Sequence, residues 1–219
     1  IYPTLHLLRG IFKRAPIDKN LLMESHLQRQ KINYPMLAKK PWLWRVYCYL
    51  AYTTECSRFH HYYQLFKTLD CEMLAIWNGQ KQPYLTMVKA AELAGKRVLY
   101  FENGLLPNTT TVDFMGVNAY NSLPRTPDFY LNLEQSTSQK SAVQLVKRDP
   151  HKKRQVTDQK LDNLDFDYIF IPFQVPADSQ IVIHSSWVHS MEQLFHLVRD
   201  ARNKLQQQGE SKLPYLVFK

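Results

Sequence analysis

The sequence predicts an α/β fold, and three observations carry that prediction. Two short apolar runs, residues 73–77 and 97–101, have the length and residue types of buried strands. Residues 83–94 between them have the pattern of an amphipathic helix that stops at Gly95, so the strands should be parallel and joined by a right-handed helical crossover. A third apolar run, residues 168–172, starts the same pattern again.

The composition allows a sizeable core and favours a phosphate-rich partner. The chain has 219 residues, 45% of them hydrophobic, and a formal net charge of +9. Such a charge suits nucleic acid, an anionic lipid surface or a sugar nucleotide. Three cysteines without a CxxC pair favour a reducing, cytoplasmic setting. No apolar run approaches the roughly 20 residues of a spanning helix, so no transmembrane segment is expected.

Two helices should precede the first strand. Residues 20–32 have the spacing of a short helix, and the region should end at Pro35. A longer helix should begin at Pro41, a residue suited to a first helical turn, and run to about Phe66. Its apolar residues recur at intervals of three and four, so we expect them to lie in the core. They are Trp42, Val46, Leu50, Phe59, Tyr62, Tyr63 and Phe66.

The second half of the chain should be a separate domain. Residues 102–127 lack periodicity and should be an irregular, functional loop, and the polar residues 136–165 should be a linker. We therefore expect one domain over residues 1–165 and the beginning of another over 166–219. In the second, a helix over 187–207 with Ser185 or Ser186 as its cap should precede a strand at 216–218. Because the chain ends on this strand, we expect it to be a fragment.

Polar residues follow both strands of the predicted parallel pair. Asn78 and Gly79 follow the first strand, and Glu102, Asn103 and Gly104 follow the second. Ligands bind at such strand ends in open parallel sheets, and a carboxylate there can act as a general base or hold sugar hydroxyls. The alternatives are a tight turn that needs Asn-Gly for its backbone angles, and a Glu that is a solvated cap.

The loop that follows holds a second set of polar groups. Asp113, Asn118, Ser122 and Arg125 could bind a polyhydroxylated acid, with the arginine pairing with a carboxylate or phosphate. The alternative is a loop in which these side chains hydrogen-bond the backbone in place of secondary structure.

A third set lies in the predicted second domain, ahead of its helix. Hydroxyls and amides at a helix N-terminus suit a phosphate, although an ordinary cap and a polar loop would also explain them. These candidate nucleotide-binding residues are Gln174, Asp178, Gln180, Ser185 and Ser186.

Several other functions lack their sequence signals. There is no Walker-type loop and no GxGxxG, which argues against an ATPase and a dinucleotide oxidoreductase. The histidine pairs His60 with His61 and His184 with His189 have no carboxylate or cysteine at ligand spacing, so no metal site is expected.

These motifs, taken in order, resemble the bacterial capsule-polysaccharide biosynthesis family of β-Kdo transferases. The resemblance extends from Met73 to the end of the chain, with the linker matching poorly. The residues that carry it are Asn78, Gly79, residues 101–107, Asp113, residues 116–118 and 121–124, Gln174, residues 178–180, Ser185 and Ser186.

The resemblance implies a glycosyltransferase that moves Kdo from CMP-Kdo, without a cofactor, to a lipid or glycan acceptor. It implies two Rossmann-like domains facing across a cleft, the second one incomplete here, and a site at the inner face of the cytoplasmic membrane. A His-Pro motif of the family is absent from this chain. Some branches of the family have Glu-Asp-Gly where this chain has Glu102, Asn103 and Gly104, so a base assigned to that Asp has no counterpart here. Glu102 remains as a candidate base, and Asp113 is the second candidate.

A non-catalytic module is the alternative. The basic cluster at residues 147–154 could bind nucleic acid or an anionic membrane surface. No aromatic interleaving or nucleic-acid motif accompanies this cluster, so we expect no nucleic-acid partner. A salt titration of binding to DNA and to anionic vesicles would discriminate the two functions.

Overall fold

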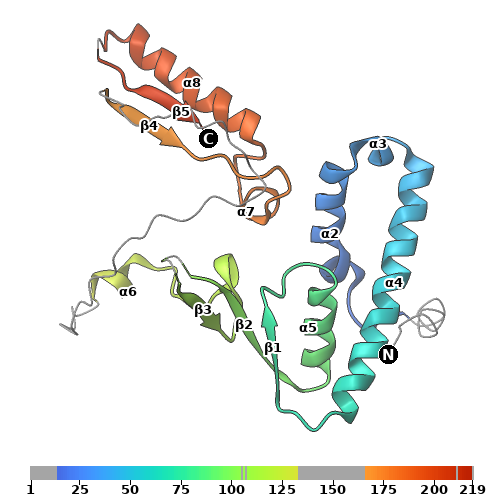
Figure 1. Ribbon diagram of the computed structural model, residues 1–219. Coiled ribbons are helices and arrows are strands. Elements are labelled where there is room, and N and C mark those ends of the chain that lie inside the picture. The colour runs from blue at the N-terminus through green and yellow to red at the C-terminus, as the bar shows by residue number, and fades with distance from the viewer. Residues whose placement is uncertain (1–13, 105, 107, 133–165, 211, 219) are drawn as a thin grey trace. The chain divides into compact units, whose positions relative to one another are not determined.

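The computed structural model describes residues 14–104, 106, 108–132, 166–210 and 212–218. These residues form two compact units (Figure 1). The first contains most of the helices and a three-stranded sheet, and the second contains a parallel strand pair with its connecting helix. The predicted boundary at residue 165 lies at the edge of a segment outside the described residues, so its position stays a prediction.

The helices before the sheet agree with the sequence pattern except for one short addition. Helix α2 spans Lys19–Asn33 and helix α4 spans Pro41–Thr68, as predicted. Proline begins α4 because the amide it lacks would have no partner in the first turn. Helix α3, Pro35–Ala38, was not predicted and joins the other two.

The sheet of the first unit contains the predicted parallel pair. Strand β1, Met73–Trp77, pairs in parallel with β2, Arg97–Asn103, and helix α5, Tyr84–Leu93, connects them. The prediction of an irregular segment over 102–127 was wrong in part, because strand β3, Thr110–Asp113, pairs antiparallel with β2. The short helices η2, Asn118–Tyr120, and α6, Pro127–Leu131, follow.

The core of this unit lies where α4 and α5 pack against the sheet. Alternation along the strands directs side chains such as Ile76 and Val98 toward α5, and Phe59 and Phe66 of α4 are buried in the same cluster. The expectation that the whole apolar face of α4 is core was wrong. Trp42, Val46 and Leu50 are exposed. The buried residues of α4 begin only at Glu55.

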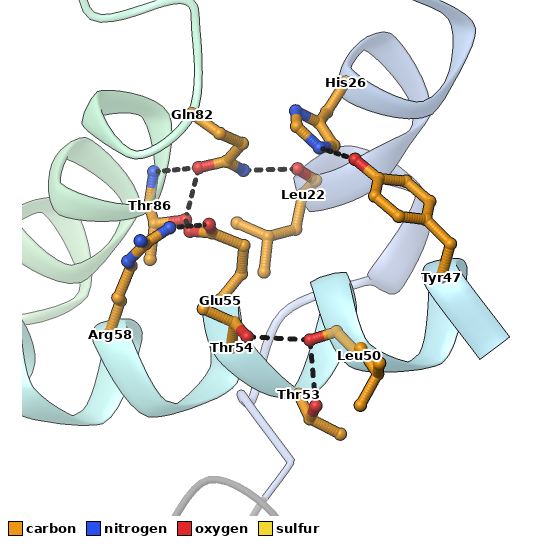
Figure 2. Close-up of polar contacts among 10 residues, drawn as sticks. All are labelled: Leu22, His26, Tyr47, Leu50, Thr53, Thr54, Glu55, Arg58, Gln82 and Thr86. Atoms are coloured by element: carbon orange, nitrogen blue, oxygen red, sulfur yellow. Dashed lines mark hydrogen bonds and ion pairs between the residues drawn. The ribbon is translucent and has the colours of Figure 1, made fainter. Parts of the chain in front are cut away.

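A buried carboxylate links the helices across this core (Figure 2). Glu55 of α4 is only 4% exposed, and its two oxygens face Arg58 of the same helix and the Thr86 hydroxyl of α5, the latter at 2.6 Å. Gln82 lies 2.6 Å from the same hydroxyl, and its amide nitrogen donates to the Leu22 carbonyl of α2 at 2.6 Å. Polar bonds thus join three helices.

The second unit repeats the strand, helix, strand pattern. Strands β4, Tyr168–Ile171, and β5, Tyr215–Phe218, are parallel, and helix α8, Met191–Gln207, connects them. Phe195 of α8 packs against Phe218 of β5 with ring centroids 5.0 Å apart. A short helix α7, Ser179–Val182, lies in the segment predicted to be a loop.

Both units are thus mixed α/β, with three strands in one sheet and two in the other among the described residues. A pair of complete Rossmann-like domains facing across a cleft stays a prediction. Within the described part of the chain, no helix is both long and apolar enough to cross a membrane.

We predict that Thr86→Val destabilises the first unit by about 1–3 kcal/mol, because it removes the hydroxyl donor from one oxygen of the buried Glu55 carboxylate. Chemical denaturation followed by circular dichroism would measure the loss. Thr54→Val is the matched control, because the Thr54 hydroxyl only bonds the Leu50 carbonyl of its own helix. Equal effects of the two changes would contradict the proposed importance of the buried bond.

Candidate functional site

The parallel pair brings Asn78 and Glu102 together, as its topology predicts. The carboxyl ends of β1 and β2 share one edge of the sheet, and Asn78 Nδ2 donates to Glu102 Oε2 at 2.5 Å. The amide of Asn103 donates to Glu102 Oε1 at 2.9 Å. One detail differs from the prediction: Glu102 and Asn103 are the last residues of β2 rather than residues after it.

The turn after β1 has a backbone that fixes the asparagine side chain. Asn78 and Gly79 both have left-handed backbones, with φ of 61° and 73°. The Asn78 amide donates to the Phe101 carbonyl at 2.7 Å, and its side-chain oxygen accepts from the Gln80 amide at 3.2 Å. Asn78 therefore fulfils both of the alternatives considered from the sequence. Its backbone makes the tight turn, and the same turn holds its side-chain amide against Glu102.

Gln80 belongs to the polar cluster after β1, although it was not among the predicted binding residues. Its side-chain amide donates to the Val117 carbonyl at 2.7 Å and so connects the turn after β1 to the loop after β3. The signal was present, because Gln80 directly follows the Asn-Gly turn, but a lone glutamine gives no indication of its partner.

Asp113 organises the loop that follows β3. Its Oδ1 accepts from the Met115 and Gly116 amides, and its Oδ2 accepts from the Ser122 amide at 2.9 Å and the Ser122 hydroxyl at 2.6 Å. Desolvation alone would raise the pKa of this carboxyl, but these hydrogen bonds outweigh it and lower the pKa below the ordinary 3.8. Asp113 is thus held in its ionised form.

Strand register relates the two carboxylates. Asp113 lies opposite Tyr100 and Glu102 lies opposite Thr111, so both carboxylates project from the same face of the sheet. They are diagonal neighbours, for which standard sheet geometry gives a Cα separation of about 7–8 Å. The sequence-predicted candidates for the base therefore share one surface.

Other predicted binding residues hold the loop together. Arg125 donates to the Asn121 side-chain oxygen at 2.7 Å and to the Ala119 carbonyl at 3.0 Å. Asn118 has a left-handed backbone, with φ of 56°. Gly104 lies so close to Thr109 that a Cβ would meet the threonine hydroxyl at 2.0 Å. These contacts explain the residues as structural members of the loop. Their contact with a substrate stays a prediction.

The two carboxylates differ in what they can do chemically. Each oxygen of Asp113 already accepts two hydrogen bonds, and a lowered pKa makes a carboxylate a weaker base. Glu102 is half-buried, and each of its oxygens accepts one hydrogen bond, from Asn78 and from the Asn103 backbone amide, so each oxygen retains a further acceptor site. Glu102 is the better placed of the two to accept a proton.

The predicted nucleotide-binding residues of the second unit mostly have local roles. Asp178 caps α7 by accepting from the Gln180 amide at 2.8 Å. The expectation that Ser185 or Ser186 caps the following helix was wrong, because α8 begins at Met191 and its cap is Ser190, which accepts from the Gln193 amide. Ser185 instead accepts from the Val188 amide at 3.1 Å.

The last predicted nucleotide-binding residue, Gln174, and the three cysteines lie apart from the Asn78 and Glu102 pair in sequence. The Gln174 amide lies 3.1 Å from the Met191 sulfur. The cysteines Cys48, Cys56 and Cys71 are free thiols. Over the described ranges, no three His, Cys, Asp or Glu side chains are close enough together to hold a metal ion.

Asn78 and Glu102 lie at the carboxyl edge of the parallel strand pair, and we call this edge the rim. The fold and the rim define an α/β protein with a candidate ligand site. Comparison with known proteins narrows this class. The family described as "Capsule polysaccharide biosynthesis protein" matches residues 72–166, which include β1, β2, β3 and the whole rim. The resemblance is therefore supported at the level of this family.

Two curated relatives agree with that match. The chain is 26% identical over 186 residues to protein FixF of Sinorhizobium fredii, covering 84% of the chain and 44% of FixF. It is 37% identical over 95 residues to the capsule polysaccharide export protein KpsS of Escherichia coli, covering 41% of the chain and 24% of KpsS. The chain thus spans less than half of the length of either relative. No solved structure matches it.

We predict that Gly79→Ala destabilises the unit more than Gly95→Ala does. Both glycines have left-handed backbones, but a Cβ at Gly79 would lie 2.8 Å from the buried Tyr100 ring, whereas one at Gly95 meets nothing within 4 Å. The difference between the two melting temperatures isolates the steric term. Equal melting temperatures would contradict this close approach.

We also predict that acid loosens the loop after β3. A carboxyl whose pKa is lowered by folding stabilises the folded loop above its ordinary pKa of 3.8, and this contribution is lost as the pH falls through the lower folded value. Asp113→Asn should loosen the loop at neutral pH and raise the exchange rate of the Ser122 amide about tenfold. Hydrogen exchange followed by mass spectrometry would detect both changes; unchanged protection in the variant would contradict them.

Proposed function

We propose that the complete protein is a glycosyltransferase of capsule or surface polysaccharide synthesis that moves Kdo from CMP-Kdo to a lipid or glycan acceptor. The observation that carries the proposal is the hydrogen-bonded pair of Asn78 and Glu102, which lies at a ligand-binding edge of the sheet and inside the segment that matches the capsule family. In this proposal the first unit holds the acceptor, and the second belongs to the CMP-sugar domain.

The transfer reaction requires a general base for the acceptor hydroxyl and groups that offset the negative charge of the leaving phosphate. The acceptor hydroxyl forms a bond to the anomeric carbon of Kdo while the bond from that carbon to the CMP phosphate breaks. The hydroxyl proton passes to Glu102, and CMP leaves with the electron pair. The leaving phosphate needs cationic groups or a helix N-terminus to offset its charge.

The side chains around Glu102 would position the sugar. Asn78 presents its amide group beside the carboxylate and fixes the orientation of that carboxylate. Asn103 is exposed at the same strand end, next to the carboxylate. Gly79, Gly104, Asn118, Ser122 and Arg125 form the turn and loop that border this rim, and their proposed part is to bind the acceptor or the sugar acid.

The basic module proposed as the alternative rests on residues 147–154, which lie outside the described residues. No specific observation in the described part of the chain favours nucleic-acid binding over transfer. The predicted nucleotide-binding residues keep a proposed part in holding CMP as residues of α7, its cap and the neighbouring loops, since none of them caps α8. They are Gln174, Asp178, Gln180, Ser185 and Ser186.

We predict that the full-length protein releases CMP from CMP-Kdo when a Kdo-terminated lipid acceptor is present. Mass spectrometry of the products would show an acceptor extended by one or more Kdo residues. Absence of CMP release from folded, full-length protein, together with activity on a UDP-sugar, would refute the donor assignment.

We predict that Glu102→Gln in the full-length protein lowers kcat about 10²- to 10⁴-fold, because the change keeps the size of the side chain but removes its proton-accepting charge. The melting temperature should change little. Asp113→Asn is the matched control on the same face. If Glu102→Gln keeps near-normal turnover and Asp113→Asn abolishes it, the base is Asp113; if both variants remain active, neither carboxylate is the base.

A further inference from the structure

An exposed apolar stripe runs along the N-terminal half of α4. Trp42, Val46, Tyr49 and Leu50 are all exposed, and their spacing of four, seven and eight residues places them on one face of the helix. Trp42 is 67% exposed, although tryptophan side chains are highly buried on average.

The turn that joins α2 to α4 also exposes large apolar side chains. Tyr34 and Met36 are exposed there, and helix α3 has no buried residue. This turn lies at the end of α4 away from the sheet (Figure 1), and α4 contacts α5 through its other half. We call these six residues the tip patch: Tyr34, Met36, Trp42, Val46, Tyr49 and Leu50.

The segment that carries the tip patch has basic residues and no acidic ones, and three of the basic residues, Lys39, Lys40 and Arg45, are exposed. Residues 25–54 contain five Lys or Arg and no Asp or Glu. Lys39 and Lys40 are exposed between α3 and α4, and Arg45 is exposed three residues after Trp42, on the same face of the helix. Exposed apolar side chains that gather on one part of a protein mark an interaction site, and the basic residues beside them favour an anionic partner.

We propose that the tip patch docks onto an anionic lipid bilayer. Trp and Tyr favour the interface between headgroups and acyl chains, and Lys and Arg beside them reach the anionic headgroups while their stems cover apolar surface. Met36, Val46 and Leu50 enter the acyl boundary. The helix lies on the surface rather than across it, in keeping with the absence of any membrane-spanning helix among the described residues.

Two other occupants fit less well. A second copy of the chain packed on this patch by a two-fold axis would bring the basic residues of both copies together without an acidic partner. Nucleic acid would use the lysines but would leave the aliphatic side chains Met36, Val46 and Leu50 without a function. The docking proposal uses the apolar and the charged residues together, and it does not depend on the identity of the transferred sugar.

The first test measures binding of the full-length protein to vesicles by co-sedimentation, without any sugar nucleotide. We expect binding to vesicles of phosphatidylglycerol and phosphatidylcholine at 1:3, and little binding to phosphatidylcholine alone. Lys39→Gln/Lys40→Gln should weaken the binding about 30-fold, because each basic side chain near an anionic surface contributes a factor of about five. Lys67→Gln/Lys81→Gln, the same loss of charge elsewhere on the unit, should have a much smaller effect.

The second test asks whether the patch enters the bilayer. Brominated lipid in the anionic vesicles should quench tryptophan fluorescence, and Trp42→Phe should remove most of that quenching. Trp187→Phe is the matched control, because Trp187 is 65% exposed in the free chain but lies in the second unit. Circular dichroism checks that all variants fold, so loss of quenching is not loss of structure.

Three results would overturn the proposal. One is no preference for anionic vesicles. Another is quenching that persists in Trp42→Phe. The third is a dimer, seen by sedimentation velocity, that Trp42→Ser dissociates while leaving vesicle binding unchanged, which would assign the patch to a second copy. Because these measurements need no transfer reaction, they can succeed or fail independently of the proposed Kdo transferase activity.

Discussion

The buried carboxylate of Glu55 is the constraint on which the packing of the first unit depends. A charge that is 4% exposed must be paired and hydrogen-bonded, because its desolvation otherwise costs several kcal/mol. Arg58 supplies the ion pair from the same helix, and Thr86 supplies a hydroxyl from α5. The pair therefore fixes where α5 lies along α4, which apolar contacts alone would specify less tightly.

That position carries over to the candidate site. Helix α5 is the crossover between β1 and β2, so fixing α5 fixes the turn that leads into it and carries Asn78 and Gly79. The Tyr100 ring packs against Gly79, and its burial together with the neighbouring Glu92 raises its pKa to about 12, so the ring remains a neutral core group. The rim thus has a packed, uncharged support beneath two polar side chains.

The parts of the fold that were predicted correctly are those governed by long periodic patterns and by topology. Helices α2, α4, α5 and α8 and strands β1, β2, β4 and β5 have such patterns, and the parallel pairing follows from the crossover helix. The same rule placed Asn78 beside Glu102. Strand β3 was missed because four residues, two of them threonines, lie between loop residues and form a strand only by pairing with β2.

Other errors arose where several residues could do the same local work. Three serines precede α8, and Ser190 is the one that caps it; the prediction overlooked Gln193 three residues later, which marks a capping box in the sequence and accepts from the neighbouring His189 amide. The exposed half of α4 was missed for a different reason. Helical periodicity identifies an apolar face but does not say what covers that face, and here the buried residues of α4 begin only at Glu55. Gln82 connects α5 to α2, since its side chain bonds Thr86 of α5 and the Leu22 carbonyl of α2, the helix that leads to the tip patch. One side chain thus joins α5, which leads from the turn of the candidate site, to α2.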